Sequence, residues 1–117
     1  MTGLVAVLAV SAMAVAALAS LYAARAQAQA AADAGALAAA VATYPPAGDG
    51  EPAARARSVV EANGAYLVGC RCARDSGLGS RVVEVIAGVR ALVPVFGEVT
   101  VRGSSRAEFD PMRWLGA

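Results

Sequence analysis

The sequence predicts an α+β fold: a long N-terminal α-helix that can cross a membrane, then a short helix and a small three-stranded antiparallel sheet. Three observations predict this fold. The stretch Leu4–Ala24 is apolar and uncharged, helix-tolerant residues continue without a break to Thr43, and strand-like segments with apolar residues at alternate positions follow Gly64. The predicted division of the chain is a helix at 1–43, a linker at 44–51, a small α+β head at 52–103 and an irregular tail at 104–117.

The first stretch, Leu4–Ala24, is interrupted only by the polar residues Ser11, Ser20 and Tyr22. A helix of about 20 such residues spans the hydrocarbon core of a bilayer, because each residue rises about 1.5 Å. The sequence therefore predicts a transmembrane helix and contact with a lipid bilayer. The residues expected to face the membrane are Leu4, Val7, Leu8, Ser11, Val15, Leu18 and Tyr22.

Two other interpretations of this stretch remain open. A secretory signal peptide could be cleaved near Ala24-Arg25-Ala26 and leave Gln27 as the first residue, although the apolar region is longer than usual and no basic residue precedes it. A buried core helix would need a larger partner than this chain provides. Arg25 alone does not determine the orientation in a membrane.

The same helix is expected to continue through Arg25–Ala42 and to end at Tyr44-Pro45-Pro46, since proline cannot continue a helix. Leu37 and Val41 stand one turn apart on one face. The many alanines would let neighbouring helices approach closely, as small residues do in membrane helix packing. The alternative is a helix of high intrinsic propensity with one solvated side.

Turn-forming residues fill the linker, and Pro52 suits the first turn of a short helix, with Asp49 and Glu51 favouring its N-terminus. This helix should end at Asn63-Gly64. Its apolar stripe consists of Ala53, Ala56, Val59 and Val60.

Three strands should follow. The first covers 65–72, with Tyr66, Val68, Cys70 and Cys72 on one face. The second covers 81–91, after a loop at 74–80, with Val83, Val85, Ala87 and Val89 on one face. The third, 98–102, follows a turn marked by Pro94 and Gly97, and we expect it to give way to a loop at 103–105 and an irregular end from Phe109.

The composition argues against several classes of function. The formal net charge is +1, histidine is absent, and the scattered arginines and few aromatic residues form no nucleic-acid platform. Cys70 and Cys72 cannot complete a four-ligand metal site without histidine or further cysteines. Two buried thiols are the default interpretation of this pair. Two cysteines at alternate positions of an extended strand are separated by a distance near the upper limit for an unstrained disulfide, so the alternative is a disulfide to a cysteine of another chain. We therefore expect a non-enzymatic protein without a metal or other cofactor.

Residues after the apolar stretch resemble a known family. The match consists of Arg25, Gln29, Ala31, Ala32, Asp33, Ala34, Ala36 and Leu37, and this pattern is similar to the signature of the TadE/TadG-like proteins of Flp (type IVb) pilus assembly. Ala62-Asn63-Gly64-Ala65, followed by Leu67, Val68 and Cys70, resembles the small actinobacterial branch found in a helicase/secretion gene neighbourhood. The resemblance extends through about Arg102.

The resemblance implies a pilin-like fold and a membrane-anchored minor pilin or pseudopilin-like component of a Tad/Flp-type pilus or secretion system. Its helix would be packed through Arg25, Gln29, Ala32, Asp33, Ala36 and Leu37. Its partners would be other pilin-like subunits, including copies of itself, and Tad-type assembly proteins, with no nucleic acid. The C-terminal domain would lie outside the cytoplasm, in the cell envelope.

Two features of pilins and relatives are not seen here. Processed pilins carry a basic leader, a peptidase site and a glutamate near the mature start, and none occurs between Met1 and Ala24. Either the true start lies upstream, or the protein is an anchored accessory. Relatives also tend to carry a cysteine before the short helix, where this chain has Glu51-Pro52-Ala53. The alternative to the pilin-like function is a small secreted or periplasmic binding module with a cleaved signal peptide.

Overall fold

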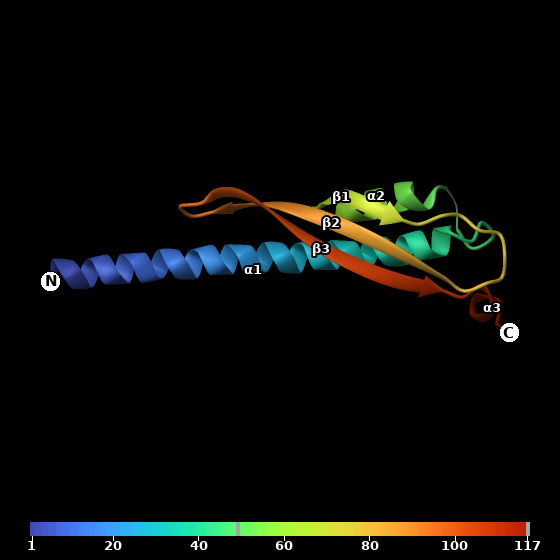
Figure 1. The fold of residues 1–117 in the computed structure, drawn as a ribbon, viewed down its shortest axis with the longest axis horizontal. Coiled ribbons are helices and arrows are strands. Elements are labelled where there is room, and N and C mark those ends of the chain that lie inside the picture. The colour runs from blue at the N-terminus through green and yellow to red at the C-terminus, as the bar shows by residue number, and fades with distance from the viewer. Residues whose placement is uncertain (49, 117) are drawn as a thin grey trace.

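The protein is described by a computed structural model that covers residues 1–48 and 50–116. Asp49 and Ala117, which the sequence analysis placed near the short helix and in the tail, lie outside the described residues. The molecule is elongated, with extents of 72 × 23 × 17 Å. One long helix sets its length, and a small sheet and a second helix cover one part of that helix (Figure 1).

Helix α1 runs without interruption from Thr2 to Ala42, as the sequence predicts. Its 41 residues give a rod of about 60 Å, at 1.5 Å per residue. Thr43 ends the helix: its backbone N–H donates to the Ala39 and Ala40 carbonyls, and its hydroxyl donates to the Ala40 carbonyl over 2.6 Å. The threonine side chain is buried and hydrogen-bonded, which fixes where the chain leaves the helix.

The rest of the chain folds back onto the C-terminal half of α1. Helix α2 (Pro52–Ala62) lies beside it, and the strands β1 (Tyr66–Arg71), β2 (Arg81–Val93) and β3 (Gly97–Phe109) form an antiparallel sheet in the order β1-β2-β3. The β2–β3 hairpin extends along α1 toward its N-terminus, past the end of β1 and α2 (Figure 1). The long helix, short helix and three-stranded sheet predicted from the sequence are all present.

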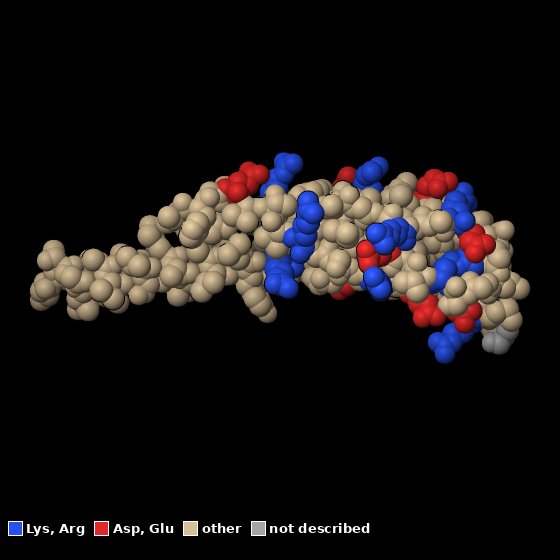
Figure 2. Space-filling view, in the orientation of Figure 1, with Lys and Arg blue, Asp and Glu red and all other residues tan. Residues whose placement is uncertain are grey.

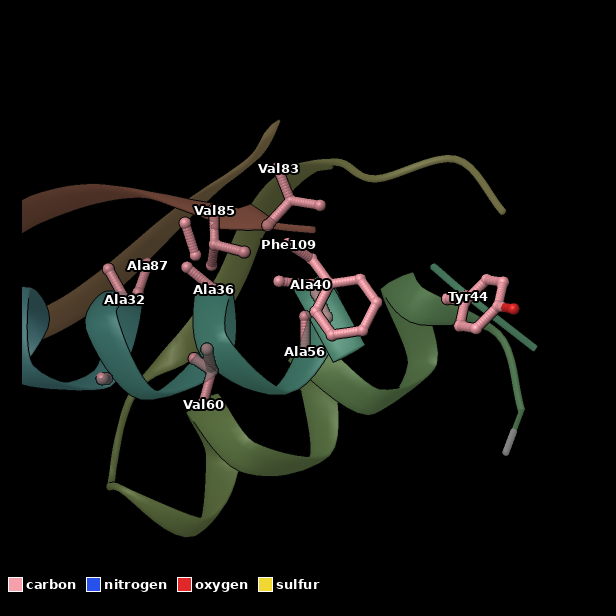
Figure 3. Close-up of a cluster of buried hydrophobic side chains, with 13 residues drawn as sticks. Ala32, Ala36, Ala40, Tyr44, Ala56, Val60, Val83, Val85, Ala87 and Phe109 are labelled. Atoms are coloured by element: carbon pink, nitrogen blue, oxygen red, sulfur yellow. The ribbon is translucent and has the colours of Figure 1, made fainter. Parts of the chain in front are cut away.

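The core lies where α1, α2 and the sheet meet (Figure 3). The predicted inward face of β2 is confirmed, since Val83, Val85, Ala87 and Val89 are all buried. On α2, Ala56 and Val60 are buried, whereas Ala53, which the sequence placed on the apolar stripe, is exposed. The α1 side of this core is built almost entirely of alanine: Ala31, Ala32, Ala36, Ala39 and Ala40.

The predicted end of the third strand was wrong. β3 passes through Gly103, Ser104 and Ser105 and remains paired with β2 as far as Phe109, opposite Arg81. Glycine and serine suggested a loop, but a glycine at 103 is what lets the strand lie directly on the α1 backbone. The expected irregular tail also contains a short helix, α3 (Pro111–Trp114), whose first turn is capped by the Asp110 carboxylate accepting from the Met112 N–H.

The predicted alternation of β1 was wrong at Val68. The register with β2 shifts between Leu67 and Gly69, which indicates a β-bulge. Because the bulge inserts one residue, Leu67 and Cys70 both pack against the core while Val68 is exposed. A uniform period of two cannot reveal such an insertion.

Candidate functional site

Most of the N-terminal half of α1 is an exposed apolar surface. Every residue that the sequence analysis expected to face the membrane is exposed: Leu4, Val7, Leu8, Ser11, Val15, Leu18 and Tyr22. Burying apolar surface of this extent is favourable by roughly 25 cal/mol per Å². Contiguous exposed apolar surface on this scale is typical of a segment that meets a membrane or other protein.

By length and composition, α1 is the one helix among the described residues that could cross a membrane, and it lies near the N-terminus. A signal sequence has the same properties. Figure 2 shows that the end of the molecule formed by the first half of α1 carries no charged side chains, whereas acidic and basic residues are distributed over the rest of the visible face. Arg25 is the first charged side chain of the sequence and therefore marks the boundary on the helix.

The head begins to cover α1 before this boundary. Ala17, Ser20 and Leu21 are partly buried within an otherwise exposed stretch, and Ala24 is buried. Ala24 and Ala28 form a second, smaller hydrophobic cluster with Val89 of β2. The apolar end and the head are therefore joined by side-chain packing across position 25.

The motif residues separate onto two faces of α1. Ala32 and Ala36 are both 0% exposed and pack against the sheet and α2, whereas Arg25, Asp33 and Leu37 are exposed, Leu37 by 65%. The expectation that Ala32 and Ala36 pack on other subunits was therefore wrong, because the chain's own sheet and α2 already cover them. Packing through the exposed residues Arg25, Asp33 and Leu37 stays a prediction. Leu37 and Val41 share one face, as their spacing predicted, and the structure shows that this face is exposed.

Two glutamines attach α1 to the head. Gln29 donates from its side-chain amide to the Ser104 carbonyl of β3 (2.7 Å) and to the Asp33 carboxylate (3.1 Å). Gln27 donates to the carbonyls of Asn63 and Gly64 (3.4 and 3.2 Å), at the end of α2. Only the family motif indicated a role for Gln29, and no pattern indicated one for Gln27. Their partners in the head, Ser104 for Gln29 and Asn63 and Gly64 for Gln27, are far away in the sequence.

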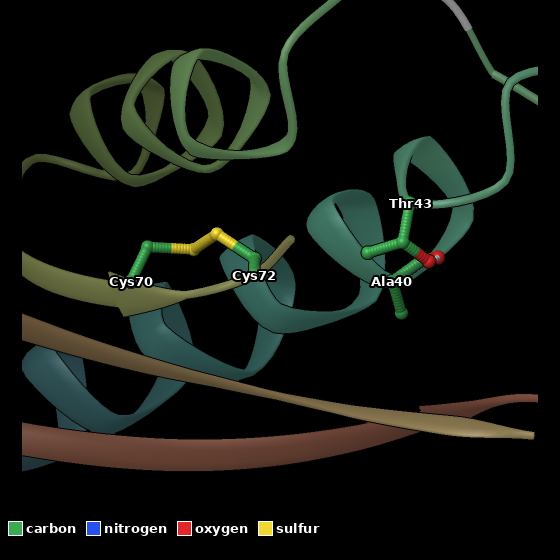
Figure 4. Close-up of a disulfide and its surroundings, with 4 residues drawn as sticks. All are labelled: Ala40, Thr43, Cys70 and Cys72. Atoms are coloured by element: carbon green, nitrogen blue, oxygen red, sulfur yellow. Dashed lines mark hydrogen bonds between the residues drawn. A yellow bond between two sulfur atoms is a disulfide. The ribbon is translucent and has the colours of Figure 1, made fainter. Parts of the chain in front are cut away.

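Cys70 and Cys72 form a disulfide, not the pair of buried thiols that the sequence analysis took as the default (Figure 4). Their Cα atoms are 5.5 Å apart, within the usual range for a disulfide. β1 ends between them, at Arg71, and both residues pack against the core near the C-terminal end of α1. The disulfide closes the end of β1 just before the loop that leads to β2.

Arg81 holds that loop against the end of α1, a role the sequence analysis missed. Its guanidinium donates to the carbonyls of Thr43, Asp75, Gly77 and Gly79 and lies 5.7 Å from the centre of the Tyr44 ring. Its side chain is only 11% exposed. The planar guanidinium of arginine can donate to several carbonyls at once. No sequence pattern indicated this role for Arg81.

Comparison with protein-family models, with curated proteins and with solved structures finds no match to this chain. The site is therefore interpreted from its own geometry.

The most extensive feature of the described surface is the exposed apolar part of α1. Within residues 1–48 and 50–116, no three histidine, cysteine, aspartate or glutamate side chains are grouped so that they could hold a metal ion. A surface depression of about 690 Å³ lies beside α3, and Phe109 and Trp114 contribute to its lining. The large apolar surface of α1 and the outward face that continues it are the features with an evident capacity to bind a partner.

Proposed function

We propose that this protein is a membrane-anchored minor pilin or pseudopilin-like component of a Tad/Flp-type pilus or secretion system, and that it acts by helix packing and not by catalysis. The anchor is the first half of α1, and the head is the sheet with α2, placed outside the cytoplasm in the cell envelope. The resemblance of the Arg25–Leu37 motif to TadE/TadG-like proteins supplies the family.

The observation that carries the proposal is the division of one continuous helix into two environments. The first half of α1 is exposed and apolar, while the second half is the central element of a folded head. A helix satisfies its own backbone hydrogen bonds, so the exposed half can lie in lipid or in a bundle of like helices at no backbone cost. A subunit that moves from membrane to filament needs this property.

The structure also bears on the secreted-module alternative. Cleavage after Ala26 would remove Ala24 from the cluster that it forms with Ala28 and Val89. It would also cut within the continuous helix α1. A cleaved product would thus expose part of its own apolar face, which favours retention of the N-terminal half.

Subunit packing in this proposal uses the outward face of α1, since the inward face is filled. The exposed residues of this face lie three or four apart and continue the apolar surface toward the head: Ala26, Ala30, Asp33, Leu37 and Val41. Copies of this chain, other pilin-like subunits and Tad-type assembly proteins are the proposed partners there.

Site-specific photo-crosslinking in native membranes tests this packing. A photoreactive residue at Leu37 should give discrete crosslinked species containing this chain and pilin-like or assembly proteins. The matched control is Arg57, exposed on α2 and away from that face, which should give none of those species. If both photoreactive variants were instead recovered as soluble, uncrosslinked monomers that start near Gln27, the protein would be a secreted module.

A further inference from the structure

The tip of the β2–β3 hairpin carries a second apolar surface that the proposed anchor does not use. Three large apolar side chains stand out from it: Leu92 (79% exposed), Val95 (79%) and Phe96 (75%). Opposite them, Val93 is buried, on the same face of β2 as the core residue Val89. The hairpin thus packs on α1 through one face and presents apolar side chains on the other face and at its turn.

The tip lies beside the uncharged half of α1. β3 crosses α1 at Gly103, next to Ala28 and Gln29. The six residues of β3 that precede Gly103 extend from there about 20 Å toward the N-terminal end of α1. The partial burial of Ala17, Ser20 and Leu21 is consistent with this path and places the end of the hairpin at the level of Ala17 or beyond. Figure 1 shows the same course of the hairpin along α1.

The hairpin tip and the N-terminal half of α1 both lack charged side chains. No charged residue occurs between Arg90 and Glu98, nor between Met1 and Arg25. Arg90 and Glu98 pair with each other at 3.9 Å across the two strands, at the base of the tip. In Figure 2 the uncharged end of the molecule accordingly includes both the N-terminal half of α1 and the hairpin tip.

The turn itself is unusual for a water-exposed hairpin. Val95 has φ = 75°, a left-handed conformation that is costly for a β-branched residue and is normally taken by glycine or asparagine. Pro94 has no N–H, and the Phe96 N–H donates to the Val93 carbonyl over 3.1 Å, so both are compatible with an apolar surrounding. A strained valine that points outward does not contribute to the folded core.

We propose that this tip inserts into the lipid of the leaflet from which the head emerges, beside α1, with Leu92, Val95 and Phe96 among the headgroups and upper acyl chains. The inference rests on the proposed membrane anchor and extends it to a second contact. The surface recognises the apolar part of the interface and not a charged headgroup, because Arg90 is paired with Glu98. Two contacts fix the rotation of the whole molecule about the axis of α1, so that the outward face of α1 keeps one orientation in the membrane.

Tryptophan fluorescence of the full chain in phosphatidylcholine vesicles tests this insertion. Trp114 is the only tryptophan, so Trp114→Phe gives a background into which Phe96→Trp places one reporter at the tip. Val15→Trp in the same background reports on the anchor. Leu78→Trp reports on the loop at the opposite end of the head, where Asp75 bonds to Thr43. Lipids brominated on their acyl chains quench only tryptophans that enter the bilayer, and acrylamide quenches those in water.

Insertion predicts strong lipid quenching at position 15, clear lipid quenching with blue-shifted emission at 96, and acrylamide quenching alone at 78. Adding Val95→Gly to the position-96 reporter should weaken its lipid quenching while raising the thermal midpoint of the head, since it removes both the apolar side chain and the strain. A fall in the thermal midpoint would contradict the claim that the positive φ of Val95 strains the turn.

Three results would overturn the inference or its basis. Lipid quenching at 15 with only acrylamide quenching at 96 would leave the anchor and exclude tip insertion. Protection of 96 from both quenchers would mean that the tip docks on protein, such as a second copy. Absence of lipid quenching at 15 would reject the anchor itself, and with it the proposed function.

Discussion

Gly103 of β3 lies directly against the backbone of α1 at Gln29: a β-carbon added at position 103 would be 2.6 Å from the Gln29 amide nitrogen. Because glycine has no side chain, the strand can approach the helix this closely. The hydrogen bond from the Gln29 side chain to the Ser104 carbonyl lies beside this contact. The two contacts together set the height at which the hairpin crosses the helix.

We therefore expect Gly103→Ala to destabilise the head by about 3 kcal/mol, because the methyl group meets helix backbone that cannot move aside. The measurement is thermal unfolding followed by circular dichroism, with the full chain in detergent micelles. Gly79→Ala is the matched control, since a β-carbon there meets nothing within 4 Å, and it should change the unfolding free energy by no more than about 0.5 kcal/mol. Equal effects of the two substitutions would contradict the close packing.

Arg81→Ala should destabilise the head by about 2–3 kcal/mol, because the loop carbonyls and the Thr43 carbonyl lose a charged donor that is largely removed from water. Arg81→Lys should recover less than half of this, since one ammonium cannot reach all the carbonyls. Hydrogen exchange should increase most in the loop between Cys72 and Arg81.

Arg106→Ala provides the comparison for Arg81. Its side chain is 75% exposed and pairs with Glu84 at 2.8 Å, so the loss should be within about 1 kcal/mol. If Arg106→Ala were as damaging as Arg81→Ala, the loop contacts of Arg81 would not be what stabilises this end of the head.

The sequence was sufficient for the elements whose residues repeat regularly. The run of α1 is uniformly apolar over a bilayer-spanning length, and the valines of β2 alternate with a period of two; both elements were located correctly. Features that depend on distant contacts could not be obtained this way. The bulge beside Val68, the strand through Gly103 and the loop held by Arg81 all follow from packing against elements far away in sequence.

The candidate site was predictable to the same degree. Most of its residues from Leu4 to Tyr22 are exposed, because an uncharged run of this length exceeds what so small a head can bury. The direction in which the alanines face was not predictable. Alanine favours helix without indicating a partner, and only the fold shows that Ala32 and Ala36 face the chain's own sheet.

The disulfide gives a third prediction. Without reductant, neither Cys70 nor Cys72 should react with iodoacetamide in the unfolded chain, whereas both should react after reduction, as followed by intact mass. Because the loop that it closes is very short, removal of the disulfide by Cys70→Ala with Cys72→Ala should cost only about 1–2 kcal/mol. Alkylation of both cysteines before reduction would show two free thiols instead.

Charge in the anchor gives a fourth prediction. Leu8→Arg combined with Val15→Arg should make membrane insertion less favourable by about 5–7 kcal/mol, since each arginine near the centre of a span costs about 2.5–3.5 kcal/mol. The protein should then leave alkali-washed membranes for the soluble fraction. Ala53→Arg with Ser58→Arg, on exposed positions of α2, adds the same charge and should leave the protein in the membrane fraction.

The most direct test of the membrane-anchored account is the intact mass and N-terminal peptide of the native protein, recovered separately from membranes and from the medium. The account predicts membrane-bound protein that retains Leu4–Ala24 and the whole of α1. Soluble protein that begins near Gln27 would contradict it and identify the chain as a secreted module released from a signal peptide.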